Sequence, residues 1–307
     1  MPAAGPRVLA LDIGGTKLAA GVGHVDGEIT RQATAPTLAA EGGEAVLKRA
    51  LDLARDCYDQ ECTTGGELPV VGVSTMGYTR SRGVELAPNV PGWHSLDIPD
   101  ALQRVFPEQR IVIGNDVKVA TRAEMSWGAL KKVDHGLYLN LGTGIAAGVV
   151  VNGRLLEGAH GAAGEVGYTL SRAWLDDGRP APAGTAAFED RFGGAGVARR
   201  LAGTELPATV AEVVAREDDD PAARTFLREL WTEIAVLVAN LCCALDPKVL
   251  AVGGGYVRGG SRLIPRVREI VAHAVPYPPT IVTARFGADA SLRGAAAAAL
   301  AAIGAAP

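Results

Sequence analysis

LALDIGGTKLAAGV, at residues 9–22, is matched later in the chain by LYLNLGTGIAAGV, at residues 137–149. Each copy is an apolar run, a Gly/Thr turn opened by an acid or its amide (Asp12 or Asn140), and a second apolar run that ends in AAGV. The pattern predicts a strand–turn–strand hairpin. Its repetition at a domain-sized interval indicates a duplicated α/β unit, so we expect two glycine-rich turns that face each other across a cleft.

The two glycine-rich turns are candidate anion sites. Glycine lets the backbone approach a ligand closely, and successive backbone amides in a turn form a concave site for an anion. Two turns directed at one cleft suit a polyphosphate chain better than a single turn does. Either turn alone is explained equally well as an ordinary tight hairpin, so it is the matched pair that favours a functional role.

Length and composition favour an enzyme of two domains. The chain has 307 residues, of which 48% are hydrophobic, and this is enough for a large core. A net charge of −4 and scattered basic residues argue against binding to a nucleic-acid backbone. No stretch is apolar and long enough to span a bilayer, and the first residues show no signal-peptide pattern. We therefore expect a cytoplasmic protein that binds neither nucleic acid nor membrane.

Hydrophobic periodicity predicts alternating strands and helices. The first three strands form an antiparallel meander, and the longest helix is apolar on most of its faces. Strands are predicted at residues 8–13, 17–23, 29–35, 70–74, 110–114, 136–152 (as a hairpin), 249–252 and 280–284. Helices are predicted at residues 45–58, 96–106, 116–127, 189–200, 208–216, 222–245, 261–273 and 291–303, and a loop at residues 153–187.

Six motifs, taken in order, resemble those of the ROK family of sugar kinases, within the superfamily of actin-like and hexokinase-like ATPases. They are LDIGGTK (11–17), PNVPGW (88–93), GND (114–116), LGTGIAAGVVVNG (141–153), HGAAGEVG (160–167) and VGGG (252–255). One glycine motif alone is weakly specific, whereas six in family order cover nearly the whole chain. The resemblance implies two ribonuclease-H-like (actin-like ATPase) α/β domains: a smaller lobe at 1–117, completed by a C-terminal helix at 291–307, and a larger lobe at 118–290.

The resemblance implies ATP and Mg²⁺ as cofactors, because phosphoryl transfer needs positioned phosphates and a divalent cation that neutralises their charge. Inorganic polyphosphate remains open as an alternative phosphoryl donor. Three glycine-rich segments would hold the nucleotide: a first phosphate loop, a second phosphate loop and an adenosine-side turn. The residues implied are Asp12, Gly14, Gly15, Thr16 and Lys17, then Gly142, Thr143 and Gly144, and finally Gly253, Gly254 and Gly255.

Asp116 is the candidate general base. It directly follows a predicted strand at the start of a predicted helix, a position that would hold its carboxylate at a fixed place for taking a proton from a sugar hydroxyl. Asn115 and Asp116 also fit an ordinary helix N-cap, where both residue types are favoured. The resemblance favours the catalytic interpretation.

The resemblance also implies a set of sugar-binding residues. Carboxylates and amides suit this purpose because each can bond to two neighbouring hydroxyl groups. His160 and Glu189 have simpler alternative interpretations, as an exposed loop histidine and as a first-turn helix acid favoured by the macrodipole. Met76 replaces the proline that usually precedes Gly77 in the family. The implied residues are Gly77, Asn89, Asn115, Asp116, His160, Glu165, Tyr168 and Glu189.

The chain departs from the family at its structural zinc site. The family's ExGH motif supplies a histidine ligand, but here it is EVGY, with Tyr168 in that position. The family's cysteine segment is replaced by PAPAGTAAFE, at residues 180–189, which contains no cysteine. The four cysteines of the chain lie elsewhere and form no C-x-x-C pair, so we expect reduced thiols and no metal site. Tyr168 either fills the vacated space or bonds to a sugar hydroxyl.

The motifs favour an ATP-dependent hexose kinase that acts on the 6-hydroxyl of an aldohexose, most simply glucose. The alternatives are a kinase for an amino- or N-acetyl-hexosamine, such as kanosamine, N-acetylglucosamine or N-acetylmannosamine, or a non-catalytic sugar-sensing relative. Sensors of this family carry a DNA-binding module ahead of the phosphate loop, and the residues before Asp12 are too few for one. A homodimer is expected by family resemblance alone.

The purified protein should contain no stoichiometric zinc, because all four ligands of the family's site are replaced. Elemental analysis by mass spectrometry checks this directly. Chelator treatment followed by excess magnesium should leave the activity unchanged. One zinc per chain, or activity that only zinc restores after chelation, would contradict the expectation.

Overall fold

The computed structural model describes residues 5–79, 83–85, 90–171, 185–257 and 262–305. It divides into two compact units, each of which is described by itself. Unit 1 consists of Met1–Lys131 together with Ala288–Pro307, and unit 2 consists of Lys132–Gly287. Within the described part of the chain, no helix combines the length and apolar character that a membrane span requires. All four cysteines are free thiols.

Unit 1 is built on a five-stranded sheet with the strand order β3-β2-β1-β4-β7. The strand β1 pairs antiparallel with β2 and parallel with β4, and β4 pairs parallel with β7. The strands are β1 (Val8–Ile13), β2 (Lys17–Gly23), β3 (Ile29–Pro36), β4 (Val70–Thr75) and β7 (Arg110–Asn115). The short strands β5 (Tyr78–Thr79) and β6 (Val84–Glu85) form a separate two-stranded ribbon.

Unit 2 repeats this topology strand for strand, with the order β10-β9-β8-β11-β12. The first two pairings are antiparallel and the last two are parallel, as in unit 1. The strands are β8 (Gly136–Leu141), β9 (Ile145–Val151), β10 (Arg154–Leu155), β11 (Val249–Gly253) and β12 (Thr280–Thr283). The predicted α/β class and the duplication of its unit are therefore confirmed.

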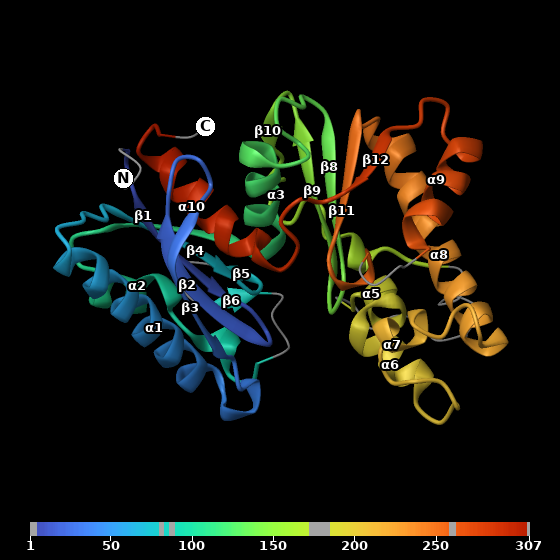
Figure 1. Ribbon diagram of the computed structural model, residues 1–307, viewed down its shortest axis with the longest axis horizontal. Helices are drawn as coiled ribbons and strands as arrows, with labels where there is room; N and C mark the ends of the chain where they lie inside the picture. Colours follow the sequence, from blue (N-terminus) through green and yellow to red (C-terminus); the bar gives the residue numbers. More distant parts are fainter. Residues whose placement is uncertain (1–4, 80–82, 86–89, 172–184, 258–261, 306–307) are drawn as a thin grey trace. The chain divides into compact units, whose positions relative to one another are not determined.

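The two faces of the unit 1 sheet differ in what covers them. Leu9, Leu11 and Ile13 pack with α1 (Gly43–Thr63) and α2 (Ile98–Val105) in one core cluster. Because side chains alternate along a strand, Asp12 projects from the opposite face. The helix α10 (Ala290–Ala302) packs on that face so closely that a Cβ on Gly72 would lie 2.0 Å from the Ala295 carbonyl oxygen. Figure 1 shows α1 and α2 on one side of the blue strands and α10 on the other.

Unit 2 has its main core between the sheet and two long helices. Leu137 and Leu139 of β8 pack with Leu227 and Ile234 of α8 (Pro221–Leu245), in a cluster that also includes residues of α9 (Leu263–Ala274). The helices α8 and α9 lie side by side in Figure 1. The described part of the unit also contains the shorter helices α5 (Ala187–Phe192), α6 (Gly194–Leu201) and α7 (Val210–Val214).

The prediction of a single helix at residues 189–200 is wrong, because two helices occupy this stretch. Gly193 separates α5 from α6 and adopts an extended backbone, with φ −74° and ψ 166°. A Cβ on Gly193 would lie 3.0 Å from the Thr143 carbonyl oxygen, and one on Gly194 would lie 3.1 Å from the Thr143 Cα. The helix is therefore interrupted where its backbone contacts the second glycine-rich turn. Helical periodicity in the sequence does not reveal such a contact.

The division between the units also differs from the predicted one, which placed it after Val117 and before residue 291. Unit 1 extends to Lys131 because α3 (Asp116–Trp127) packs against α10. A Cβ on Gly294 of α10 would lie 1.8 Å from the Val119 carbonyl oxygen of α3. The indole N–H of Trp127 donates to the Val25 carbonyl oxygen at 3.0 Å, which ties the end of α3 to the β2–β3 turn.

Candidate active site

Three parallel strands of unit 1 end level with one another. The register pairs Asp12 of β1 with Ser74 of β4, and Ser74 with Gly114 of β7. Ligands of open α/β sheets bind at the carboxyl ends of parallel strands, where neighbouring connections diverge. The first glycine-rich turn follows β1 at this edge, Gly77 follows β4, and Asp116 follows β7. Among the residues that the structure describes, the predicted site residues of unit 1 thus lie at this edge of its sheet.

The first glycine-rich turn is held by bonds from its own strand and from Thr37. Gly14 N–H donates to the Lys17 carbonyl oxygen at 3.1 Å. Thr37 donates from its hydroxyl to the Gly14 carbonyl oxygen at 2.6 Å and from its backbone N–H to the Thr16 carbonyl oxygen at 3.0 Å. Gly15 and Thr16 are exposed at the tip of the turn. Thr37 is fully buried, and no motif predicted its contact with this turn.

Asp12 is a buried carboxyl group with other acids nearby. Its side chain is 8% exposed, and burial is the main reason that its pKa rises from 3.8 to about 7. The carboxylates of Asp116 and Asp289 raise the pKa further, whereas Ser74 and Lys17 lower it. The fully buried Ser74 hydroxyl lies near this carboxyl group, but has no partner at ordinary hydrogen-bond distance among the described residues. The stabilisation of ionised Asp12 by Lys17 and Ser74 is thus smaller than the cost of burying its charge beside two other acids.

Asn115 and Asp116 share the start of α3, but they do different things. Asn115 is the N-cap, and its Oδ1 accepts from the backbone N–H groups of Val117 at 3.1 Å and Lys118 at 3.4 Å. Asp116 is the first helical residue, is half-buried, and accepts from Val117 N–H at 2.8 Å. The Asn115 amide nitrogen is 3.5 Å from the carbonyl oxygen of Gly77. The capping interpretation therefore describes Asn115, whereas Asp116 is the first residue inside the helix.

Two contacts at this edge were not predicted as parts of the site. Lys17 Nζ lies 3.9 Å from Asp289 Oδ1, and both side chains are 42% exposed, so the pair is a loose one. Asp289 precedes α10 as its N-cap, and its sequence signal is only that of a helix start. Met76 lies beside the first glycine-rich turn, since a Cβ on Gly15 would meet its sulfur at 3.5 Å.

In unit 2, the second and third glycine-rich turns adjoin. Gly142 N–H donates to the Gly144 carbonyl oxygen at 3.2 Å and closes the second turn, with Thr143 exposed at its tip. A Cβ on Gly142 would lie 3.3 Å from the backbone nitrogen of Gly255. Gly254 has a φ of 91°, and a Cβ there would lie 2.1 Å from the Leu141 carbonyl oxygen, so only glycine fits. The predicted nucleotide residues of unit 2 therefore form one continuous backbone surface.

Three predicted sugar-binding residues lie together in unit 2. Burial raises the pKa of Glu189, and the neighbouring charge of Glu165 raises it further, while a hydrogen bond from Ile145 N–H acts in the opposite direction. Burial also raises the pKa of Tyr168, which lies in the 3₁₀ turn Val166–Tyr168, and the charges of Glu165 and Glu189 add to the effect. The side chain of Tyr168 is thus close to both carboxylates.

For the remaining predicted sugar-binding residues, His160 and Asn89, the structure gives little information. His160 is exposed in the loop before Glu165. Asn89 lies outside the described residues, as do residues 180–184 of the segment that replaces the family's cysteine motif. Among the residues that the structure describes, no three histidine, cysteine or acidic side chains are grouped so that they could hold a metal ion by themselves.

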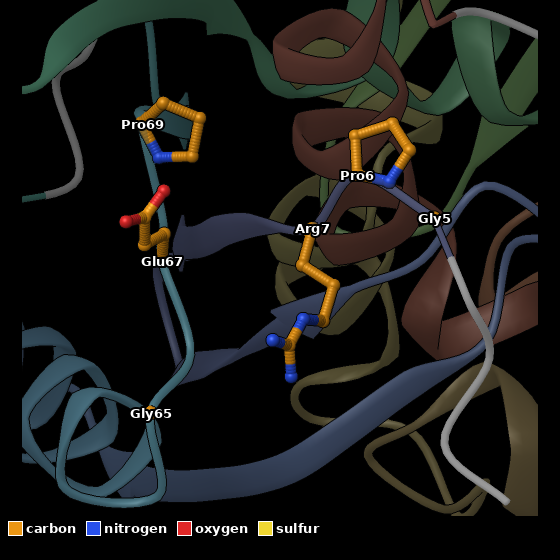
Figure 2. Close-up of a pocket in the computed structure, with 6 residues that line it drawn as sticks. All are labelled: Gly5, Pro6, Arg7, Gly65, Glu67 and Pro69. Atoms are coloured by element: carbon orange, nitrogen blue, oxygen red, sulfur yellow. The ribbon is translucent and has the colours of Figure 1, made fainter.

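A pocket of about 400 Å³ lies elsewhere in unit 1, at the amino ends of β1 and β4. Figure 2 shows Arg7 on one wall, with Glu67 and Pro69 on the neighbouring segment. The guanidinium group of Arg7 is already paired with Glu61, a side chain that is only 5% exposed. The cation of this pocket is therefore already paired, and the pocket lies away from the strand ends where the predicted residues gather.

Comparison with known proteins agrees with this arrangement. The sequence pattern of the ROK family matches residues 8–302. The chain is 28% identical to a glucokinase of Thermotoga maritima, over 94% of this chain and 96% of that protein. It is also 28% identical to an N-acetylmannosamine kinase of Pasteurella multocida, over 94% and 95%. The crystal structure of a ROK hexokinase from Thermus thermophilus aligns with a TM-score of 0.80 and 29% identity, over 97% and 99%.

Asp12→Asn should stabilise the ligand-free protein more at pH 8 than at pH 5. The pKa of Asp12 is about 7 in the folded protein against 3.8 ordinarily, so the folded state binds the proton more tightly. Below about pH 4 the raised pKa costs no stability, because Asp12 is protonated in both the folded and the unfolded state. As the pH rises from about 4 to about 7, the free energy of unfolding falls by about 1.4 kcal/mol per pH unit. Asparagine stays neutral, so the variant does not lose this stability as the pH rises. Thermal unfolding at both pH values, in a chelating buffer, measures the effect.

Asp52→Asn is the control, because Asp52 is 61% exposed and pairs only with Lys48 on the same helix. Its melting temperature relative to the unmodified protein should change little between the two pH values. A stabilisation by Asp12→Asn that is the same at pH 5 and pH 8 would contradict the proposed cost of ionising Asp12.

Proposed function

The chain belongs to the ROK family, and we propose that it is an ATP-dependent kinase acting on the 6-hydroxyl of an aldohexose, with glucose as the favoured acceptor. The similarity to a glucokinase over nearly the full length of both chains supports a sugar kinase. The choice of glucose rests on the same similarity and on the motif order.

The position of Asp116 is the observation that carries the catalytic part of the proposal. The side chain follows β7 directly and is held at the first position of α3 by Val117 N–H, at 2.8 Å. It lies at the same edge of the sheet as the first glycine-rich turn, and its charge raises the pKa of Asp12. A carboxylate fixed in this way suits a general base, which takes the proton from the sugar hydroxyl as the phosphoryl group arrives.

The glycine-rich turns are assigned to the nucleotide. In unit 1, Lys17 and the exposed amides of Gly15 and Thr16 would bind phosphate oxygens, because a turn of backbone N–H groups favours an anion. In unit 2, the adjoining turns that contain Thr143 and Gly254 offer a close backbone approach to the rest of the nucleotide. Displacement of Asp289 from Lys17 would accompany phosphate binding, and their separation of 3.9 Å makes this inexpensive.

Magnesium fits the acidic group of unit 1. Mg²⁺ is usually bound through one or two carboxylates, several waters and the phosphates of its substrate, so it does not need a cage of protein ligands. Asp12 would supply such a carboxylate, and its burial, its raised pKa and the nearby Ser74 hydroxyl, which has no hydrogen-bond partner among the described residues, fit a cation bound beside it. When bound, the ion would neutralise charge on the transferred phosphoryl group.

Glu165, Glu189 and Tyr168 are assigned to the sugar. Two carboxylates close together can accept hydrogen bonds from several hydroxyl groups, and their mutual repulsion is relieved when hydroxyl donors arrive. The Tyr168 hydroxyl can donate or accept at the same place, whereas the histidine of the family's usual motif is absent here. Asn89, Asn115, Gly77 and His160 are assigned to the sugar by motif order.

An amino- or N-acetyl-hexosamine is the second candidate acceptor, because an N-acetylmannosamine kinase is as similar in identity as the glucokinase. A coupled assay of ADP release should compare kcat/KM for glucose, mannose, N-acetylglucosamine, N-acetylmannosamine and kanosamine, with ATP and polyphosphate as donors. We expect glucose with ATP to give the highest value. A higher value for a hexosamine would move the assignment to that class, and no turnover with any sugar would favour a sugar sensor.

Asp116→Ala and Asp116→Asn should both lower kcat by about 10²–10⁴-fold, the usual cost of losing a general base. The KM for ATP should change little. Asp97→Asn provides the control, because Asp97 caps α2 and accepts from Asp100 N–H at 3.0 Å without lying at the site. That control should keep its kcat and nearly all of its stability, because asparagine caps a helix about as well as aspartate does. A near-normal kcat in the Asp116 variants would remove Asp116 from the role.

A further inference from the structure

Glu189 contacts the second glycine-rich turn directly. Its Oε2 accepts a hydrogen bond from the backbone N–H of Ile145, at 2.7 Å. Ile145 is the first residue of β9, immediately after Gly144. A Cβ on Gly144 would lie 3.2 Å from the same carboxylate oxygen, so the side chain also touches the turn itself. A residue assigned to the sugar therefore bonds to the loop assigned to phosphate.

The side chain of Glu189 is enclosed by glycines that leave it no room to move aside. A Cβ on Gly167 would lie 3.1 Å from the Glu189 Cβ, and one on Gly193 would lie 2.8 Å from its Cγ. Contacts this short mean that any larger residue at either position would displace Glu189. The carboxylate is thus positioned by its surroundings and not by a flexible stem.

The end of α5 joins the same assembly to the third glycine-rich turn. Gly194 N–H donates to the Gly142 carbonyl oxygen at 2.8 Å. The hydroxyl of Tyr256, which follows that third turn, donates to the Phe192 carbonyl oxygen at 2.8 Å. One short helix therefore connects Glu189 with both nucleotide turns of unit 2.

We propose that Glu189 is a positioning residue for the nucleotide: its bond to Ile145 N–H holds the second glycine-rich turn in its binding conformation. This inference rests on the proposed function, which assigns the turn to ATP. Among the described residues, no donor reaches the other carboxylate oxygen, which is thus available to a sugar hydroxyl. A turn that Glu189 already holds in order binds nucleotide at a smaller entropic cost.

The bond can be tested without substrate. Hydrogen exchange of a peptide covering residues 141–147 should be about tenfold faster in Glu189→Ala, because an amide bonded to a charged acceptor loses its partner. Glu189→Gln keeps an acceptor oxygen and should exchange nearly as slowly as the unmodified protein. Asp190→Ala is the matched control: it removes the neighbouring acid of α5, whose carboxylate bonds to Arg199 at 3.0 Å, and should leave exchange unchanged.

Calorimetric titration with ADP, in the absence of sugar, gives the second readout. We expect Glu189→Ala to bind ADP about tenfold more weakly, with Glu189→Gln and Asp190→Ala close to the unmodified protein. A residue that only bound sugar would leave both measurements unchanged, and that result would overturn the proposal. Equal effects from Asp190→Ala and Glu189→Ala would also overturn it, since they would indicate general loss of α5. Neither measurement depends on turnover. A failure of this proposal can therefore be distinguished from a failure of the proposed function, which the sugar screen tests.

Discussion

Parallel pairing of β1 with β4, and of β4 with β7, is the constraint on which the unit 1 site depends. A one-residue slip would turn Asp12 from the α10 face into the apolar core beside α1, because successive side chains alternate between faces. The observed register instead sets Asp12 beside Ser74 and ends β7 just before Asp116. Two acids that are far apart in the sequence thereby share one edge of the sheet.

The same constraint acts in unit 2 with different chemistry. Asn140 occupies in β8 the place that Asp12 occupies in β1, and its register partner is Gly253 where Asp12 has Ser74. The first copy therefore has acids at the ends of its own strands, whereas the second has an amide and glycines there, and its nearest acid, Glu189, comes from α5. This difference suits a cation beside the first turn and close backbone contact with a nucleotide beside the second.

The hairpins, the meander and the helices at residues 45–58, 222–245 and 291–303 were predictable because local periodicity decides them. The resemblance to the ROK family, drawn from six motifs, is confirmed by the family match over residues 8–302. Ser74, Thr37 and Asp289 were not predictable as neighbours of the site, because strand register and helix packing place them there. The break at Gly193 was missed for a similar reason, since the contact that causes it comes from a turn some fifty residues earlier.

The outer strand β3 also limits how copies of the chain can associate. An exposed strand edge is an open template on which a second chain can continue the sheet. Here the pairing of β3 with β2 shifts register between Ala20 and Val22, Arg31 has a φ of 49°, and Pro36 at the strand end has no N–H group to donate. Arg31 is moreover turned back onto Glu61. Association of two copies by continuing the sheet from β3 is therefore disfavoured.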